Sequence, residues 1–185
     1  DRLRSRGLGD VYKRQVMDIA RYLKQNNERD YVMFTTGIYS GLRVSDILKL
    51  RVKDVRGKDY IAMREKKTKK EKRFIINKNL KKILEAWTRG KDDLQYLLEN
   101  PVTHRPISRQ RAWEVMRNAG EEFGVYNLGT HTMRKTFGYH MYQATHDAVM
   151  LMKLFNHSDI HVTLRYIGVE QDETDQAISK LDFGV

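Results

Sequence analysis

The stretch HTMRKTFGYHMYQATHDAVMLMKLFNHSDIHVTLRY, residues 131–166, contains the groups on which the interpretation of the whole sequence depends. His131 and Arg134 are three residues apart, so on a helix they would lie on one face. His157 and Tyr166 follow further along the chain. An arginine binds two phosphate oxygens with its planar fork, a histidine exchanges a proton near neutral pH, and a tyrosine can attack phosphorus. The combination predicts phosphoryl transfer on DNA through an ester between the protein and a phosphate.

The order of these residues resembles the C-terminal signature of the tyrosine recombinases, also called the phage integrase family. In that family an H-x-x-R motif is followed by a short apolar helix that ends in G-H, and then by a tyrosine. Two positions depart from this pattern. Asn156 replaces the usual glycine before His157, and Lys135 stands where many members have histidine. Neither position supplies a reactive group, so the departures concern the packing around the site.

A second match lies upstream, in the segment GLRVSDILKL of residues 41–50. It resembles the first arginine box of the same family, G-L-R-x-S-E/D followed by I/L-x-x-L, and it identifies Arg43 as a phosphate ligand. Asp46 lies one helical turn beyond Arg43 and stands where glutamate is more common. Taken alone, the two residues would be interpreted as an ordinary surface pair. With the resemblance, we expect Asp46 to hold the guanidinium in a fixed orientation.

The basic run from Lys66 to Arg73 contains six Lys or Arg and one Glu, a formal charge of +5 in eight residues. Most such runs are solvated hairpin tips. The family, however, carries its catalytic lysine in a β-hairpin, typically directly before a threonine. Because Lys67 precedes Thr68, the resemblance identifies Lys67 as that lysine, with its neighbours Lys66 and Lys69 as alternatives that are otherwise expected to contact DNA.

The resemblance implies six catalytic residues: Arg43, Lys67, His131, Arg134, His157 and Tyr166. The two arginines would bind the non-bridging oxygens, where negative charge grows in the transition state. Tyr166, with an unperturbed pKa near 10, needs a base, and His131 is expected to take its proton. His157 would donate a hydrogen bond to the phosphate, and Lys67 would protonate the departing 5′ oxygen. The product is a 3′-phosphotyrosine that retains the bond energy, so the resemblance implies no cofactor.

Composition agrees with a nucleic-acid partner. The chain has 185 residues, a formal net charge of +11 and no cysteine. A strongly basic soluble domain of this size most often meets a polyanion. The lack of cysteine excludes a disulfide scaffold and Cys-ligated zinc, and it suits a cytoplasmic location. No apolar run approaches the ~20 residues of a membrane span, so no membrane partner is expected.

The first fifteen residues differ from the rest. Asp10–Gln15 (DVYKRQ) resembles the translation of a sequencing adapter, so we interpret residues 1–15 as a non-native leader, with an authentic basic arm as the alternative. The leader has a charge of +3, which leaves +8 for residues 16–185. We expect residues 16–185 to form one catalytic domain without the N-terminal DNA-clamping domain that family members usually carry.

Hydrophobic periodicity predicts a mainly α domain with a small three-stranded antiparallel β-sheet, an α+β arrangement that agrees with the catalytic-core fold of the tyrosine recombinases. The expected helices are 16–25, 28–40, 79–89, 108–124, 130–145, 147–155 and 159–166, and the expected strands are 52–55, 59–65 and 72–77. Gly41 should end the second helix, and Ser108, Thr130 and Asp159 should cap the starts of three others.

The helix after Ser108 bears Arg109 and Arg111 in its first turn, where the helix dipole favours acidic residues. That mismatch has a reason if a phosphate backbone lies opposite, so we expect Arg109 and Arg111 to bind DNA; an ordinary surface is the alternative. A metal site is not expected. His157 and His161 have a ligand-like spacing, but no H-E-x-x-H or paired-carboxylate motif accompanies them.

The resemblance implies double-stranded DNA as the partner and a homo-tetramer on paired recombination sites. Ile178 and Leu181 lie at helical spacing in the tail and could anchor it on a neighbouring protomer or on its own domain. Two other functions remain open at this point. One is a type IB topoisomerase with similar catalytic groups, and the other is a non-catalytic helix-turn-helix DNA binder that uses 108–124 and 130–145.

Overall fold

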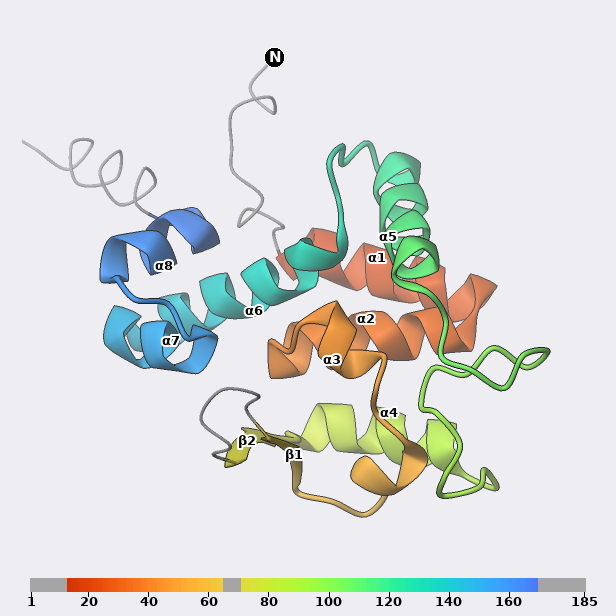
Figure 1. The fold of residues 1–185 in the computed structure, drawn as a ribbon. Helices are drawn as coiled ribbons and strands as arrows, with labels where there is room; N and C mark the ends of the chain where they lie inside the picture. Colours follow the sequence, from red (N-terminus) through yellow and green to blue (C-terminus); the bar gives the residue numbers. More distant parts are fainter. Residues whose placement is uncertain (1–12, 65–70, 170–185) are drawn as a thin grey trace, which may run out of the picture.

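A computed structural model describes residues 13–64 and 71–169, which form a set of helices with a short antiparallel hairpin at one side (Figure 1). The elements in chain order are α1 (Lys13–Asn26), α2 (Glu28–Ser40), α3 (Val44–Ile47), the 3₁₀ turn η1 (Val52–Asp54), β1 (Tyr60–Arg64), β2 (Glu71–Ile75), α4 (Lys78–Thr88), α5 (Arg109–Glu122), α6 (Thr130–Thr145), α7 (Ala148–Phe155) and α8 (Ile160–Ile167). Within this part of the chain, no helix combines the length and apolar character needed to cross a bilayer.

Of the three N-cap residues predicted from the sequence, Ser108 and Asp159 are confirmed and Thr130 is wrong. The side chains of Ser108 and Asp159 accept backbone hydrogen bonds at the starts of α5 and α8. Thr130, in contrast, is the first helical residue of α6, and Gly129 is its N-cap. The hydroxyl of Thr132 accepts a hydrogen bond from the Gly129 amide at 3.1 Å, so the cap comes from inside the helix.

Among the described residues, the sheet has two strands instead of the three predicted. β1 and β2 pair in antiparallel register from Tyr60↔Ile75 to Arg64↔Glu71. The predicted first strand is the 3₁₀ turn η1, in which Val52 and Val55 are both buried. Both residues can face the core at a spacing of three only if the chain turns, since in a strand they would point to opposite faces. The Asp54 carboxylate fixes this turn by accepting a hydrogen bond from the Arg51 amide at 2.8 Å.

Several features predicted from the sequence lie partly or wholly outside the described residues. α1 begins at Lys13, three residues before the predicted domain start at Val16, so its first turn includes the end of the predicted leader. The described residues do not include the rest of that leader, the lysines at 66, 67 and 69, or the tail positions Ile178 and Leu181.

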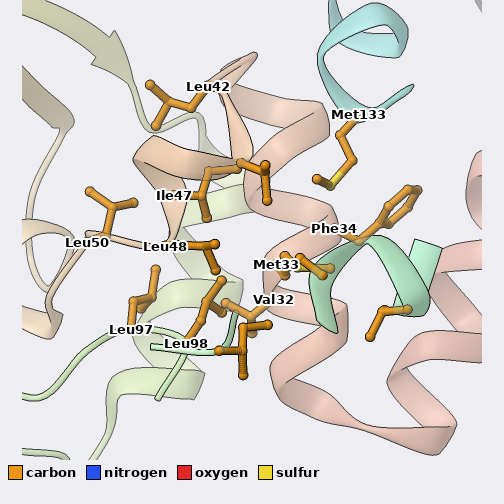
Figure 2. Close-up of a cluster of buried hydrophobic side chains, with 14 of the residues drawn as sticks. Val32, Met33, Phe34, Leu42, Ile47, Leu48, Leu50, Leu97, Leu98 and Met133 are labelled. Atoms are coloured by element: carbon orange, nitrogen blue, oxygen red, sulfur yellow. The ribbon is translucent and has the colours of Figure 1, made fainter. Parts of the chain in front are cut away.

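Helix α2 lies at the centre of the larger of two hydrophobic clusters. Its buried residues lie on almost every side of the helix, so it must be surrounded. Figure 2 shows Val32, Met33 and Phe34 of α2 among side chains from α3, α6 and the segment before α5. On this framework α3, the β1–β2 hairpin and α6 are held next to one another.

A smaller cluster joins α6, α7 and α8 at the other end of the molecule (Figure 1). Its buried members are Tyr142, Leu151, Phe155, Ile167 and Val169. Helix α6 belongs to both clusters, because its Met133 packs in the larger one and its Tyr142 in the smaller one. The residues between these two points of α6 therefore lie where the two clusters meet.

Glycines allow α6 to approach its neighbours closely. A Cβ atom at Gly37 of α2 would lie 2.7 Å from the Met133 sulfur, and one at Gly138 of α6 would lie 2.6 Å from Ile167 Cγ2. Gly41, which ends α2 as predicted, has φ +65° and would bring a Cβ within 2.4 Å of the Phe137 ring. Real Cβ atoms do not pack at such distances, so these positions fix the spacing of α2, α6 and α8.

Gly41→Ala and Gly90→Ala form a matched pair that separates packing from backbone strain. Both glycines have positive φ, +65° and +72°, but no atom of the described residues lies within 4 Å of a Cβ at Gly90. Each variant loses the conformational advantage of glycine, and only Gly41→Ala also overpacks the contact with Phe137. Denaturant unfolding should therefore show Gly41→Ala to be less stable than Gly90→Ala by about 1–3 kcal/mol. Equal losses would contradict the close α2–α6 contact.

Candidate active site

The guanidinium of Arg134 is the innermost group of the candidate site. The side chain projects from the second turn of α6, and the residue is only 5% exposed. One Nη group donates to the Gly41 carbonyl at 2.5 Å, and the other donates to the Phe155 carbonyl at 3.2 Å. The guanidinium carbon also lies 4.2 Å from the centroid of the Phe155 ring. Arg134 therefore links the C-terminal ends of α2 and α7.

This link has a simple physical basis. The last carbonyls of a helix have no partner within the helix, and they carry the negative end of its dipole. Gly41 is the C-cap of α2 and Phe155 is the last residue of α7. A guanidinium has five N–H groups in a rigid fork, so it can bind both carbonyls and still have N–H groups left for other acceptors.

Tyr166 is the next neighbour of this guanidinium. It lies near the end of α8, close enough to Arg134 for the guanidinium charge to act on its hydroxyl. Its ring makes edge-to-face contacts with Phe155 and His157, with centroid distances of 5.7 and 5.2 Å. Burial raises the pKa of Tyr166 above 10, and the positive charges of Arg134 and Arg43 oppose this shift without cancelling it. The ring is thus held by its aromatic neighbours, and the hydroxyl is protonated at neutral pH.

His157 lies beside Tyr166, in the turn between α7 and α8. Its Nδ1 is 3.0 Å from the hydroxyl of Thr163, a fully buried residue of α8. Desolvation lowers the pKa of His157 below 6.5, and the nearby charges of Arg134 and Arg43 lower it further. The imidazole is consequently neutral at pH 7, with one nitrogen oriented by Thr163 and the other available to a substrate.

An open pocket of about 430 Å³ lies next to this group, between α3, the hairpin and the end of α7. Its lining holds five basic residues and one acidic residue: Arg43, Lys49, Arg64, Lys72, Arg134 and Asp46. Tyr166 and His157 do not line it themselves, but both contact Phe155, which forms part of its wall. Such an excess of positive charge in a hollow suits an anion, and the planar guanidinium groups suit phosphate oxygens.

Arg43 and Arg134 contribute to this charge in different ways. Arg43 is the exposed N-cap of α3, whereas Arg134 is buried. Burial lowers the pKa of Arg134 to about 10, and repulsion from Arg43 adds to the effect, while Tyr166 and Asp46 act in the opposite direction. Arg134 still carries its charge at pH 7. Two like charges held close together in this way favour an anion between them.

Comparison with known proteins agrees with this geometry. The model of the phage integrase family matches residues 10–173. The probable integrase/recombinase YoeC of Bacillus subtilis (strain 168) is 43% identical over 160 residues, which are 86% of this chain and 88% of that protein. The chain belongs to the phage integrase family. A tyrosine recombinase of Pseudothermotoga lettingae is 28% identical over 159 residues, and there the match covers 84% of this chain but only 54% of the relative.

Solved structures show the same fold. The XerA recombinase superposes with a TM-score of 0.73 at 16% identity, over 94% of this chain and 64% of that one. The catalytic domain of bacteriophage HP1 integrase superposes with a TM-score of 0.61 at 18% identity, over 92% and 93% of the two chains. As a member of the phage integrase family, this chain is a site-specific recombinase of the tyrosine type, an enzyme that breaks and rejoins DNA strands. The recombinases among its relatives favour this class over a topoisomerase or a non-catalytic DNA binder.

The fold brings together four of the six residues that the family resemblance implies. Arg43, Arg134, His157 and Tyr166 interact electrostatically in one site. His131 lies in the first turn of α6, exposed, and it is not among the residues that line the pocket next to Arg134. His131 is thus exposed and Arg134 buried, although they are only three residues apart. The role of His131 as a base remains a prediction.

The other predicted contacts have mixed outcomes. Lys66, Lys67 and Lys69 lie outside the described residues, so their roles remain predictions. Arg109 is exposed at the start of α5. Arg111 is also exposed, but it pairs with the buried Asp30 at 3.6 Å and with Glu114 at 3.8 Å. DNA binding by Arg111 would therefore compete with its contact to Asp30, which joins α5 to α2.

Asp46 has a different partner from the one expected. Its carboxylate lies 3.9 Å from the Lys49 ammonium, one turn along the chain, and among the described residues it makes no ion pair with Arg43. Its charge nevertheless raises the pKa of Arg134. Asp46 therefore balances the positive charge of the pocket instead of orienting Arg43. The described His, Asp and Glu residues form no group of three that could hold a metal ion.

Sequence reasoning missed several residues that shape the site. Thr163 orients His157, and Lys135, expected to affect only packing, places its ammonium 5.3 Å from the centroid of the Tyr166 ring. Lys72 donates to the side chain of Asn156 across the mouth of the pocket. One signal for Lys72 was visible, because it alternates with Phe74 and Ile76 on the strand face that should be apolar.

The lowered pKa of His157 gives a direct test of the site. In DNA-free protein with labelled histidine, NMR titration should place the His157 midpoint below 6.5. Arg43→Gln removes an exposed positive charge near the imidazole and should raise the midpoint toward that value. Arg21→Gln removes an exposed arginine from α1 and should leave it unchanged. A wild-type midpoint at or above 6.5 would contradict the arrangement of charges described here.

Proposed function

We propose that this recombinase cuts DNA by attack of the Tyr166 hydroxyl on a phosphodiester held by Arg43 and Arg134. The observation that carries the proposal is the closeness of Tyr166 to the buried Arg134, since both pack on the Phe155 ring at the edge of a strongly basic pocket. A phosphate bound by the same guanidinium would lie next to the tyrosine oxygen. The nucleophile Tyr166 and the phosphate ligand Arg134 are therefore next to each other before DNA binds.

The chemistry of the step is balanced by the groups at the site. The Tyr166 oxygen forms a bond to phosphorus as it loses its proton, the bond from phosphorus to the 5′ oxygen breaks, and that oxygen takes up a proton. The product is a 3′-phosphotyrosine and a free 5′-hydroxyl. Negative charge grows on the non-bridging oxygens during this exchange, and fixed cations such as Arg43 and Arg134 stabilise it without reorganisation.

Proton transfer needs assistance, because burial keeps Tyr166 protonated at neutral pH. We assign the base to His131 and the general acid to Lys67, following the family pattern. Neutral His157, oriented through Thr163, has its second nitrogen available to hydrogen-bond the phosphate. The ester preserves the energy of the phosphodiester, so the reverse step rejoins a strand, and the proposal requires no nucleotide cofactor and no metal.

The partner in this proposal is double-stranded DNA, with two sites brought together by a homo-tetramer. The solved relatives include XerH recombinase bound to its difH substrate and the integrase of transposon Tn1549 in complex with DNA. The chain spans about half the length of several curated relatives that it matches, so DNA contacts made by the remaining part of such proteins are not represented. We place the reaction in the cytoplasm, in keeping with a basic domain that lacks cysteine.

Tyr166→Phe removes only the proposed nucleophilic oxygen. On a nicked DNA substrate that traps the cleaved state, wild-type protein should form a covalent adduct that survives a denaturing gel, and Tyr166→Phe should form none while binding DNA normally. Tyr126→Phe is the matched control, since Tyr126 is 74% exposed, and it should form the adduct at the wild-type level. An adduct formed by Tyr166→Phe would refute the assignment.

Arg43→Gln tests the phosphate ligand separately from the fold. Arg43 is exposed, so its loss should leave thermal stability unchanged, whereas Arg134 also joins two helices. Cleavage by Arg43→Gln should slow by about 10²–10³-fold, the usual effect of losing one fixed donor to a developing oxyanion. Arg21→Gln should cleave like the wild type. A wild-type cleavage rate in Arg43→Gln would show that Arg43 does not contact the phosphate.

A further inference from the structure

Lys72 occupies an unusual position on the hairpin. It alternates with the buried Phe74 of β2 and with the buried Ile76 just after the strand, and across the ladder it pairs with Met63 of β1. Side chains on this face point toward the protein interior because they alternate along a strand. Lys72 itself is half-buried and lines the open pocket, so its ammonium stays in contact with water and can reach polar groups on the opposite wall.

The partner of Lys72 is the C-terminal end of α7. The Lys72 ammonium donates to the Asn156 side-chain oxygen at 2.7 Å and lies 3.3 Å from the Lys153 carbonyl. The carbonyl is one of the last acceptors of α7, where the helix dipole favours a cation. Lys72 and Asn156 are 84 residues apart in the chain, so this contact joins two distant elements across one pocket.

The backbone of Asn156 explains how its side chain reaches the hairpin. Asn156 is the C-cap of α7 and has φ +57°, in the left-handed region. Glycine and asparagine are the residues that adopt this conformation most readily. The family pattern has glycine at this position, and glycine would end the helix equally well but would offer no acceptor to Lys72.

We propose that Asn156 is a positioning residue, which holds the β1–β2 hairpin against the end of α7 through its hydrogen bond to Lys72. The contact fixes the hairpin wall of the pocket, including Arg64, relative to Arg43 and Arg134. It also fixes the strand ends, Arg64 and Glu71, between which the predicted lysines lie in the sequence. This inference rests on the proposed function, because it assigns the contact a role in the cleavage step.

Asn156→Gly is the decisive variant, because glycine preserves the left-handed cap and removes only the side chain. Its melting temperature should be unchanged or raised, and its affinity for DNA should be unchanged. The rate of adduct formation at saturating protein should fall by about ten- to a hundredfold, since a small misplacement of a catalytic group has effects of this size. Asn127→Gly is the matched control. Asn127 also has positive φ, +69°, but lies in the α5–α6 connection, and the variant should react at the wild-type rate.

Two further variants show whether the two side chains act together. Asn156→Asp keeps an acceptor for the ammonium and should restore most of the rate. Lys72→Met should slow adduct formation as much as Asn156→Gly does, and the double variant should be no slower than either single variant. The proposal is overturned if Asn156→Gly reacts at the wild-type rate, if Asn156→Asp is as slow as Asn156→Gly, or if the two losses multiply. Failure of the wild-type protein to form any adduct would instead refute the proposed function itself.

Discussion

The site depends on one buried guanidinium that binds the ends of two helices. Arg134 donates to the carbonyls of Gly41 and Phe155, packs on the Phe155 ring and places its charge near the Tyr166 hydroxyl. Removing a charge from water is costly, and the lowered pKa of Arg134 reflects that cost. Two helix C-termini offset it, because each presents carbonyl groups at the negative end of its dipole. The same contacts that stabilise the charge thus place it beside the nucleophile.

This arrangement joins the two hydrophobic clusters of the domain. Arg134 lies on α6 between Met133 of the larger cluster and Tyr142 of the smaller one. Arg43 comes from the side of α3, while His157 and Tyr166 come from the side of α7 and α8. The catalytic groups therefore meet across the boundary between the clusters, and glycines at 37, 41 and 138 keep the boundary narrow. A change in the packing of α6 would alter the site even if no catalytic residue were replaced.

Much of the helical framework could be predicted from local patterns. The caps at Ser108 and Asp159 and the stop at Gly41 depend on a few neighbouring residues, and all three are confirmed. The strand predicted at 52–55 failed because the four residues VKDV fit a strand or a tight turn, and the burial of both valines, which requires the turn, depends on distant packing partners. The deep burial of Arg134 was equally invisible, since its acceptors are 93 and 21 residues away in the chain. Order and spacing thus identified the chemical groups, but not the contacts that position them.

The state of the Arg134 guanidinium in DNA-free protein tests the central claim most directly. NMR of protein labelled with ¹⁵N-arginine can observe the side-chain N–H groups of single arginines. Hydrogen bonds to Gly41 and Phe155 should give Arg134 separate Nη signals that exchange slowly with water, whereas the exposed Arg43 should give averaged, rapidly exchanging signals. If Arg134 exchanged as rapidly as Arg43, its guanidinium would not be fixed before DNA binds, and the account of a preassembled site would be wrong.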